Sequence, residues 1–172
     1  MSFLRKIFKR KVTSSELGEE LFQYCMFFVK DMYDAFKETI DELECEKIVK
    51  DMRFAASEIL CVNMWIVSRA LHSDQFNKSL DHMHACYLDS VDESNREDAK
   101  VFITDRYEEY YNEFTEKNEL VFCSKVLANI FNDGKVTGNY FDIFLIPPVV
   151  LVYMKNITEG AADHVKNIKI ID

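Results

Sequence analysis

The chain has 172 residues, 48% of them hydrophobic, which suits one domain with one hydrophobic core. Only 4 glycines and 2 prolines occur, and this scarcity of turn residues argues for long helices rather than many short strands. The net charge is −9, and because the first eleven residues hold five cations and no acid, the remainder carries −14, which argues against direct binding to nucleic acid.

The first eleven residues, MSFLRKIFKRK, combine large apolar and basic side chains. A helix over residues 3–10 would turn about 100° per residue and would place the two kinds of side chain on opposite faces. We therefore predict a short amphipathic helix within a basic segment, residues 1–12, that precedes a single helical domain, residues 13–172. The candidate residues for binding a membrane or a partner are Phe3, Leu4, Arg5, Lys6, Ile7, Phe8, Lys9 and Arg10.

This basic segment has three candidate partners: an anionic membrane surface, an acidic groove on another protein, and the acidic body of its own chain. Burying four large apolar side chains is worth roughly 6 to 12 kcal/mol, whereas ordering about ten residues costs on the order of 15 kcal/mol. Anionic lipid adds about 1 kcal/mol per nearby basic residue, so membrane binding would be weak and reversible.

Three long helices are predicted in the first half of the domain. The first begins at a capping box, Thr13–Glu16, and its apolar residues recur at steps of three and four as far as Leu43. A break follows near residues 41–46. The second apolar stripe runs over residues 48–71, and the third helix begins near Ser73 and ends before the polar run DESNRED.

The second half continues with a fourth helix from Ala99 and a fifth over residues 120–131, with Gly134 as its stop. Pro147 and Pro148 are typical of the first turn of a helix, whereas the VVLVY that follows is equally typical of a buried strand. We favour a sixth helix that ends at Gly160, followed by a short helix or an ordered tail.

The expected fold is therefore all-α: a single-domain bundle of five to six helices with a short amphipathic helix at the amino terminus. Six apolar residues on the predicted stripes are expected in its core. They are Leu21, Phe28, Ile59, Ile66, Met83 and Leu127.

One stretch resembles a metal site, with His82 and Cys86 four residues apart on a predicted helix. Asp89 lies about 10 Å further along the helix axis than His82, too far to share the same ion, so a ligand from another helix, such as His72, would be required. Polar residues on a partly exposed helix account for the pattern more simply. No phosphate-binding loop, nucleophile elbow or zinc-protease sequence occurs, so we predict no cofactor and no catalytic residues.

A second stretch, DRYEEYYNEF, is rich in residues that often dominate protein interfaces. Tyrosine is also common at the boundary between a core and water, where its ring is buried and its hydroxyl is hydrated. The candidate interface residues are Arg106, Tyr107, Tyr110 and Tyr111.

The five cysteines are widely spaced and include no C-x-x-C pair, which is typical of reduced thiols. The chain also begins without the apolar core of a secretory signal peptide. We expect a cytoplasmic protein, with the inner face of the membrane as the place where the basic segment would act.

These observations favour a non-enzymatic interaction or regulatory protein that binds a protein partner, with peripheral membrane attachment through the basic segment as an added role. One alternative is a small helical enzyme or metal-binding protein that uses His72, His82 and Cys86. A further alternative is an acidic decoy that inhibits a nucleic-acid-binding partner.

Overall fold

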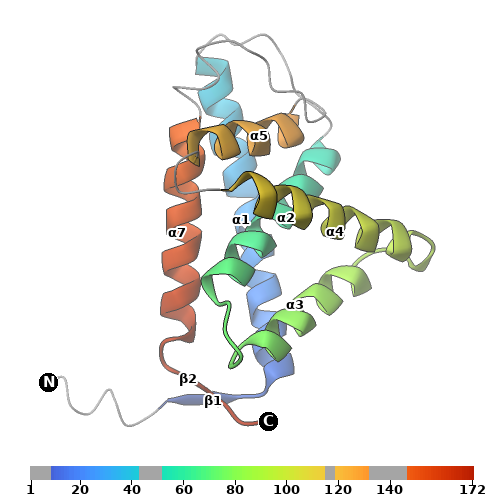
Figure 1. Ribbon diagram of the computed structural model, residues 1–172, viewed down its shortest axis with the longest axis vertical. Coiled ribbons are helices and arrows are strands. Elements are labelled where there is room, and N and C mark those ends of the chain that lie inside the picture. Colours follow the sequence, from blue (N-terminus) through green and yellow to red (C-terminus); the bar gives the residue numbers. More distant parts are fainter. Residues whose placement is uncertain (1–8, 43–51, 115–118, 132–146) are drawn as a thin grey trace, which may run out of the picture.

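The computed structural model describes residues 9–42, 52–114, 119–131 and 147–172. These residues form an all-α fold, as predicted, to which two short strands add a small sheet (Figure 1). In chain order the elements are β1 (Arg10–Val12), α1 (Ser14–Glu42), α2 (Met52–Ala70), α3 (Asn77–Asp89), a 3-10 turn (Glu93–Asn95), α4 (Arg96–Glu113), α5 (Glu119–Phe131), α7 (Pro147–Val165) and β2 (Ile168–Ile170).

Helix α2 is the central element and contacts each of the other described α-helices. All of its residues from 58 to 68 are buried, so it is enclosed on every side and does not have one apolar face. In Figure 1, α1 and α7 run along the long axis of the molecule, whereas α3 and α4 extend to the right. No described helix is both long enough and apolar enough to cross a membrane.

The predicted capping box at the start of α1 is confirmed. The backbone N–H of Thr13 donates to Glu16 Oε2 at 2.7 Å, and the backbone N–H of Glu16 donates to Thr13 Oγ1 at 3.2 Å. Each side chain therefore satisfies an amide that the first helical turn leaves without a partner. Next to this cap, Ser14 donates from its backbone N–H and its hydroxyl to a carboxylate oxygen of Asp172, which fixes the end of the chain to the start of α1.

The small sheet changes the expectation for the amino-terminal segment. Strand β1 pairs in parallel with β2, so Arg10 is in a strand and not at the end of an amphipathic helix as predicted. Extended backbone turns the side chain of Val12 into the core, opposite its register partner Ile170, while Lys11 faces solvent. Residues 1–8, which hold most of the predicted helix, lie outside the described residues.

The prediction that the sixth helix ends at Gly160 is wrong, because α7 continues to Val165. Instead of ending the helix, Gly160 lets the side chain of Tyr24 on α1 lie close to the backbone of α7. A Cβ at this position would lie 2.2 Å from the hydroxyl oxygen of Tyr24. The strand alternative for residues 149–153 is also excluded, since α7 begins at Pro147 and includes them. The tail after α7 is ordered as β2.

Helix α3 is shorter than predicted, because it begins at Asn77 and not near Ser73, and it ends at Asp89, before the polar run DESNRED. The second part of that run opens the next helix. Glu97 and Asp98 lie in the first turn of α4, where carboxylates interact favourably with the helix dipole. Helix α4 therefore begins at Arg96, three residues before the predicted start. The predicted stop at Gly134 and most of the break near residues 41–46 fall outside the described residues.

Five of the six predicted core residues are buried: Leu21, Ile59, Ile66, Met83 and Leu127. Phe28 is only partly buried, so that prediction is wrong. The ring of Phe28 packs edge-to-face against the ring of Tyr153 on α7, with the two ring centroids 6.3 Å apart. The largest fully buried side chain is Trp65, in the middle of α2.

Candidate functional site

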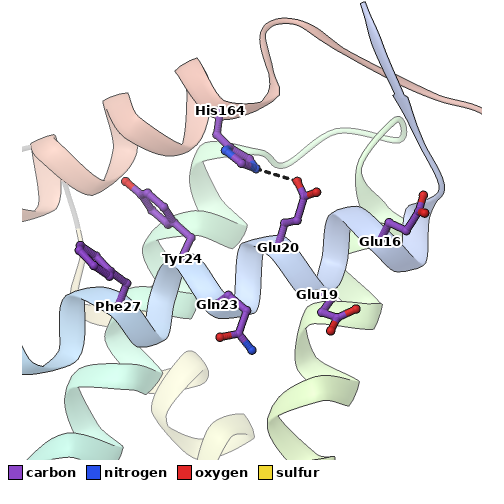
Figure 2. Close-up of a pocket in the computed structure, with 7 residues that line it drawn as sticks. All are labelled: Glu16, Glu19, Glu20, Gln23, Tyr24, Phe27 and His164. Atoms are coloured by element: carbon purple, nitrogen blue, oxygen red, sulfur yellow. Dashed lines mark hydrogen bonds and ion pairs between the residues drawn. The ribbon is translucent and has the colours of Figure 1, made fainter.

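A hollow of about 500 Å³ lies along the first half of α1, where α1 faces the end of α7. We call it the α1–α7 groove. Six of its lining residues come from α1 at spacings that share one side of a helix, and the seventh comes from α7 (Figure 2). The lining residues are Glu16, Glu19, Glu20, Gln23, Tyr24, Phe27 and His164.

One half of the α1–α7 groove is aromatic. Phe27 is 70% exposed, the largest exposure among the large hydrophobic residues that the structure describes. Tyr24 lies beside α7, where its hydroxyl donates a long hydrogen bond to the carbonyl oxygen of Ile157 at 3.4 Å and its ring stacks near that of His164. Burial raises the pKa of Tyr24, so it stays a neutral hydrogen-bond donor. This half is therefore an aromatic wall, formed by Tyr24 and His164, next to the exposed Phe27.

The other half is acidic. Glu20 accepts hydrogen bonds from both terminal nitrogens of Arg10, with Nη1 to Oε1 at 2.8 Å, and from His164 Nε2 at 3.0 Å. The Arg10 guanidinium holds the pKa of Glu20 below its usual range. Glu16 belongs to the capping box, and Glu19 is exposed and without an ion-pair partner among the described residues. A cation brought into this half would therefore lie close to three carboxylates, those of Glu16, Glu19 and Glu20.

The sequence had pointed to neither half of the groove. Phe27 does not lie on the apolar stripe of α1, which passes through Tyr24 and Phe28, and a large aromatic residue off the stripe of an amphipathic helix is expected to face solvent. That mismatch is the signal in the sequence that could have located the groove. The contribution of His164 depends on the packing of α7 and has no local signal.

The predicted amino-terminal binding residues are described only in part. Residues 3–8 lie outside the described residues, so the membrane contact stays a prediction. Lys9 is exposed, and Arg10 lies at the edge of the α1–α7 groove through its bond to Glu20.

The predicted metal-site residues are not brought together. His72 and His82 are exposed, and no group of three potential ligands among the described histidine, cysteine, aspartate and glutamate residues could hold a metal ion. Burial raises the pKa of the Cys86 thiol, which disfavours the thiolate that a metal or a nucleophilic reaction would require.

The predicted interface residues of α4 mostly face inward. Arg106 donates to the fully buried carboxylate of Glu58 on α2, with Nε to Oε2 at 2.8 Å and Nη2 to Oε1 at 2.6 Å. Tyr110 is fully buried against Trp65, and only Tyr111, at 54% exposure, remains largely on the surface. The reason is that a buried carboxylate requires a cation, and Arg106 is the one that reaches it.

Tyr107, the fourth predicted interface residue, holds a histidine of α3. Its hydroxyl donates to His84 Nε2 at 2.8 Å, while His84 Nδ1 lies 2.7 Å from the carbonyl oxygen of Leu80. These two partners suit a neutral imidazole with its proton on Nδ1. Burial lowers the pKa of His84, and the hydrogen bond to the Leu80 carbonyl and the nearby carboxylate of Asp81 oppose that shift more weakly.

This arrangement predicts a loss of stability in mild acid. The unfolded chain takes up a proton at His84 near the ordinary pKa of about 6.5, whereas the folded protein resists it until a lower pH. The stabilisation is therefore complete above about pH 6.5 and is lost as the pH falls toward the folded pKa.

Urea unfolding at a series of pH values should show a free energy of unfolding that falls below pH 6.5, and a smaller fall in the His84→Gln variant. The exposed His82→Gln is the matched control and should keep the slope of the unaltered protein. An undiminished slope in His84→Gln would contradict the assignment.

Comparisons with protein families, with curated proteins and with solved structures found no match to this chain.

Proposed function

We propose that this protein is a non-enzymatic interaction protein whose α1–α7 groove binds a basic, apolar segment of a partner protein. The observation that carries the proposal is the exposure of Phe27 directly beside the carboxylates of the same helix face. A partner that buries Phe27 removes a large apolar side chain from water, and its cations can pair with Glu16 and Glu19.

Charge complementarity supports a cationic occupant. Outside its first eleven residues the chain carries a net charge of −14, and such a surface attracts basic partners and repels acidic ones. Arg10 shows that a guanidinium can bind in the acidic half of the groove, because it already pairs there with Glu20. Glu19 remains available to a second cation.

The aromatic half supports an apolar component in the same occupant. Burying a phenylalanine side chain is worth about 1.5 to 3 kcal/mol, and aromatic residues are enriched among those that dominate binding energies. Tyr24 provides a neighbouring aromatic surface that is already partly buried against α7, so an occupant can contact both rings. An occupant with alternating basic and apolar residues matches both halves.

The proposal predicts selective binding of a basic amphipathic peptide. We expect a labelled helical peptide of leucine, phenylalanine and arginine to bind the full-length protein, with an affinity that falls as salt rises. The matched peptide with glutamate in place of arginine should not bind. Phe27→Ser should weaken binding about tenfold or more, equivalent to about 1.4 kcal/mol, and Glu19→Lys should weaken it in the same direction. Fluorescence anisotropy measures both effects.

Two matched variants control for changes elsewhere on the surface. Phe54→Ser alters another exposed phenylalanine, on α2, and Glu108→Lys alters an exposed glutamate on α4, and neither residue lines the groove. Both should bind the peptide as the unaltered protein does. The proposal fails if the basic and acidic peptides bind equally, or if Phe27→Ser and Phe54→Ser have the same effect.

The basic segment of the same chain is the competing occupant. Combined Arg5→Glu and Lys6→Glu substitutions would remove cations from it while leaving the groove residues unchanged. A rise in peptide affinity in this variant would show that residues 1–8 compete for the groove, and an unchanged affinity would leave the partner protein as its occupant.

A further inference from the structure

A second pocket, of about 240 Å³, lies between α2 and α7 and is separate from the α1–α7 groove. Its walls combine buried apolar side chains with two exposed polar ones, Arg69 and Thr158. We call it the Trp65 pocket. Its lining residues are Trp65, Ile66, Arg69, Ala70, Met154 and Thr158.

Arg69 brings a positive charge to this pocket. Its guanidinium carbon lies 3.7 Å from the ring centroid of Phe114 and 5.8 Å from that of Trp65. Stacking on aromatic rings leaves the N–H groups at the edge of the guanidinium unused. Among the described residues, no carboxylate forms an ion pair with Arg69. Its fork of donors is therefore suited to an external carboxylate.

Trp65 forms the deepest part of the same wall, because its side chain is fully buried. Its indole N–H is buried and has no acceptor among the described residues, although buried N–H groups are almost always paired. The indole ring is held by aromatic neighbours on α4 and α5, including Tyr110 and Phe122 at centroid distances of 5.6 and 5.1 Å. The pocket thus combines the charged donors of Arg69 and the hydroxyl of Thr158 with an apolar wall of Trp65, Ile66 and Met154.

We propose that the Trp65 pocket binds a small organic carboxylate, whose carboxylate group pairs with Arg69 and whose hydrocarbon part lies against Trp65, Ile66 and Met154. The volume of about 240 Å³ exceeds the roughly 150 Å³ of an apolar cavity that holds benzene, so a ligand of about four to six carbon atoms fits. Inorganic phosphate fits less well, because a single arginine and apolar walls do not replace the hydration of a more highly charged ion.

The chain contains one tryptophan, so its intrinsic fluorescence reports directly on this pocket. We expect a saturable change in emission when the full-length protein is titrated with butyrate, at constant ionic strength set with sodium chloride. Butyramide, the neutral analogue, and inorganic phosphate should each bind at least tenfold more weakly. Equal responses to butyrate and butyramide, equal responses to butyrate and phosphate, or no saturable response to butyrate would each overturn the proposal.

Two variants test the pocket from its charged and its apolar sides. Arg69→Gln removes the charge and should weaken butyrate binding at least tenfold, with Arg69→Lys intermediate. Ala70→Leu leaves Arg69 in place and fills part of the volume, and it should also weaken binding. Circular dichroism and the melting temperature verify that each variant is folded. If Arg69→Gln does not fold, Ala70→Leu decides the matter.

Arg96→Gln is the matched control, because this exposed arginine of α4 pairs with Asp89 and does not line the pocket. It should bind butyrate as the unaltered protein does. Unchanged binding in Ala70→Leu, or a loss in Arg96→Gln equal to that in Arg69→Gln, would overturn the proposal.

Discussion

Replacing Arg106 with alanine is expected to lower the free energy of unfolding by about 3 to 5 kcal/mol. The substitution leaves the Glu58 carboxylate, which is fully buried in α2, without the cation that binds both of its oxygens. It also removes a hydrogen bond to Glu109, which Lys125 and Asn129 of α5 bind as well. Urea unfolding followed by tryptophan fluorescence measures the loss.

Two further variants separate this explanation from a general effect of losing an arginine. Arg96→Ala removes an exposed ion pair with Asp89 and should cost less than about 1 kcal/mol. Replacing both Glu58 and Arg106 with methionine removes both charges together and should recover most of the stability that Arg106→Ala loses. A loss of less than 1 kcal/mol in Arg106→Ala would show that Glu58 is not buried against it.

The Arg106 pair also shows where interpretation of the sequence reached its limit. Arg106 stands among tyrosines on α4, a composition that protein interfaces share with the boundary of a core. Its partner Glu58 is 48 residues away in the chain. A carboxylate on a predicted helix is expected at the surface unless the neighbouring helices are known, so the pair had no local signal.

Helix α2 illustrates the same limit for the core. The sequence predicted one apolar stripe through Ile59, Val62 and Ile66, and all three residues are buried. The structure buries Trp65 and Asn63 as well, because α2 is surrounded by the other described helices. A position of this kind in the fold depends on contacts between distant segments, which helical periodicity does not encode.

Local chemistry was predicted more successfully than distant contacts. The capping box at Thr13 and the first-turn prolines of α7 need only residues within one turn, and both predictions hold. The β1–β2 sheet joins the two ends of the chain, so neither strand could be predicted from its own neighbours. The α1–α7 groove has the same origin, since it requires His164 beside a face of α1.

Gly18 is the second position at which a small change should have a large effect. It lies on α1 against α3, and a Cβ there would lie 2.4 Å from His82 Cβ and 2.6 Å from the carbonyl oxygen of Ser79. Two of the three nearest atoms belong to the backbone of α3, including the amide nitrogen of Met83 at 2.9 Å. Backbone atoms within a helix do not move aside singly, so any side chain at position 18 has to displace α3 as a whole.

We therefore expect Gly18→Ala to destabilise the protein by about 2 to 3 kcal/mol, near the upper end of the usual cost of overpacking. This loss is expected although alanine forms helices better than glycine by about 1 kcal/mol, which would stabilise α1 if the site were open. Gly18→Val should cost more, because its branched side chain adds volume to the same contact. Thermal and urea unfolding of the two variants provide the measurement.

Gly160→Ala is the matched comparison, because its nearest obstacle is the hydroxyl oxygen of Tyr24 and the atoms close to it all belong to that one side chain. The Tyr24 side chain can swing aside about its Cα–Cβ bond, and the hydrogen bond that it would give up, to Ile157, is long at 3.4 Å. The gain in helix propensity of about 1 kcal/mol should then offset most of the cost, so Gly160→Ala should be nearly neutral. No side chain at position 18 can turn away from the two backbone atoms of α3. A Gly18→Ala variant as stable as the unaltered protein would therefore show that α1 and α3 are packed less closely than in the structure.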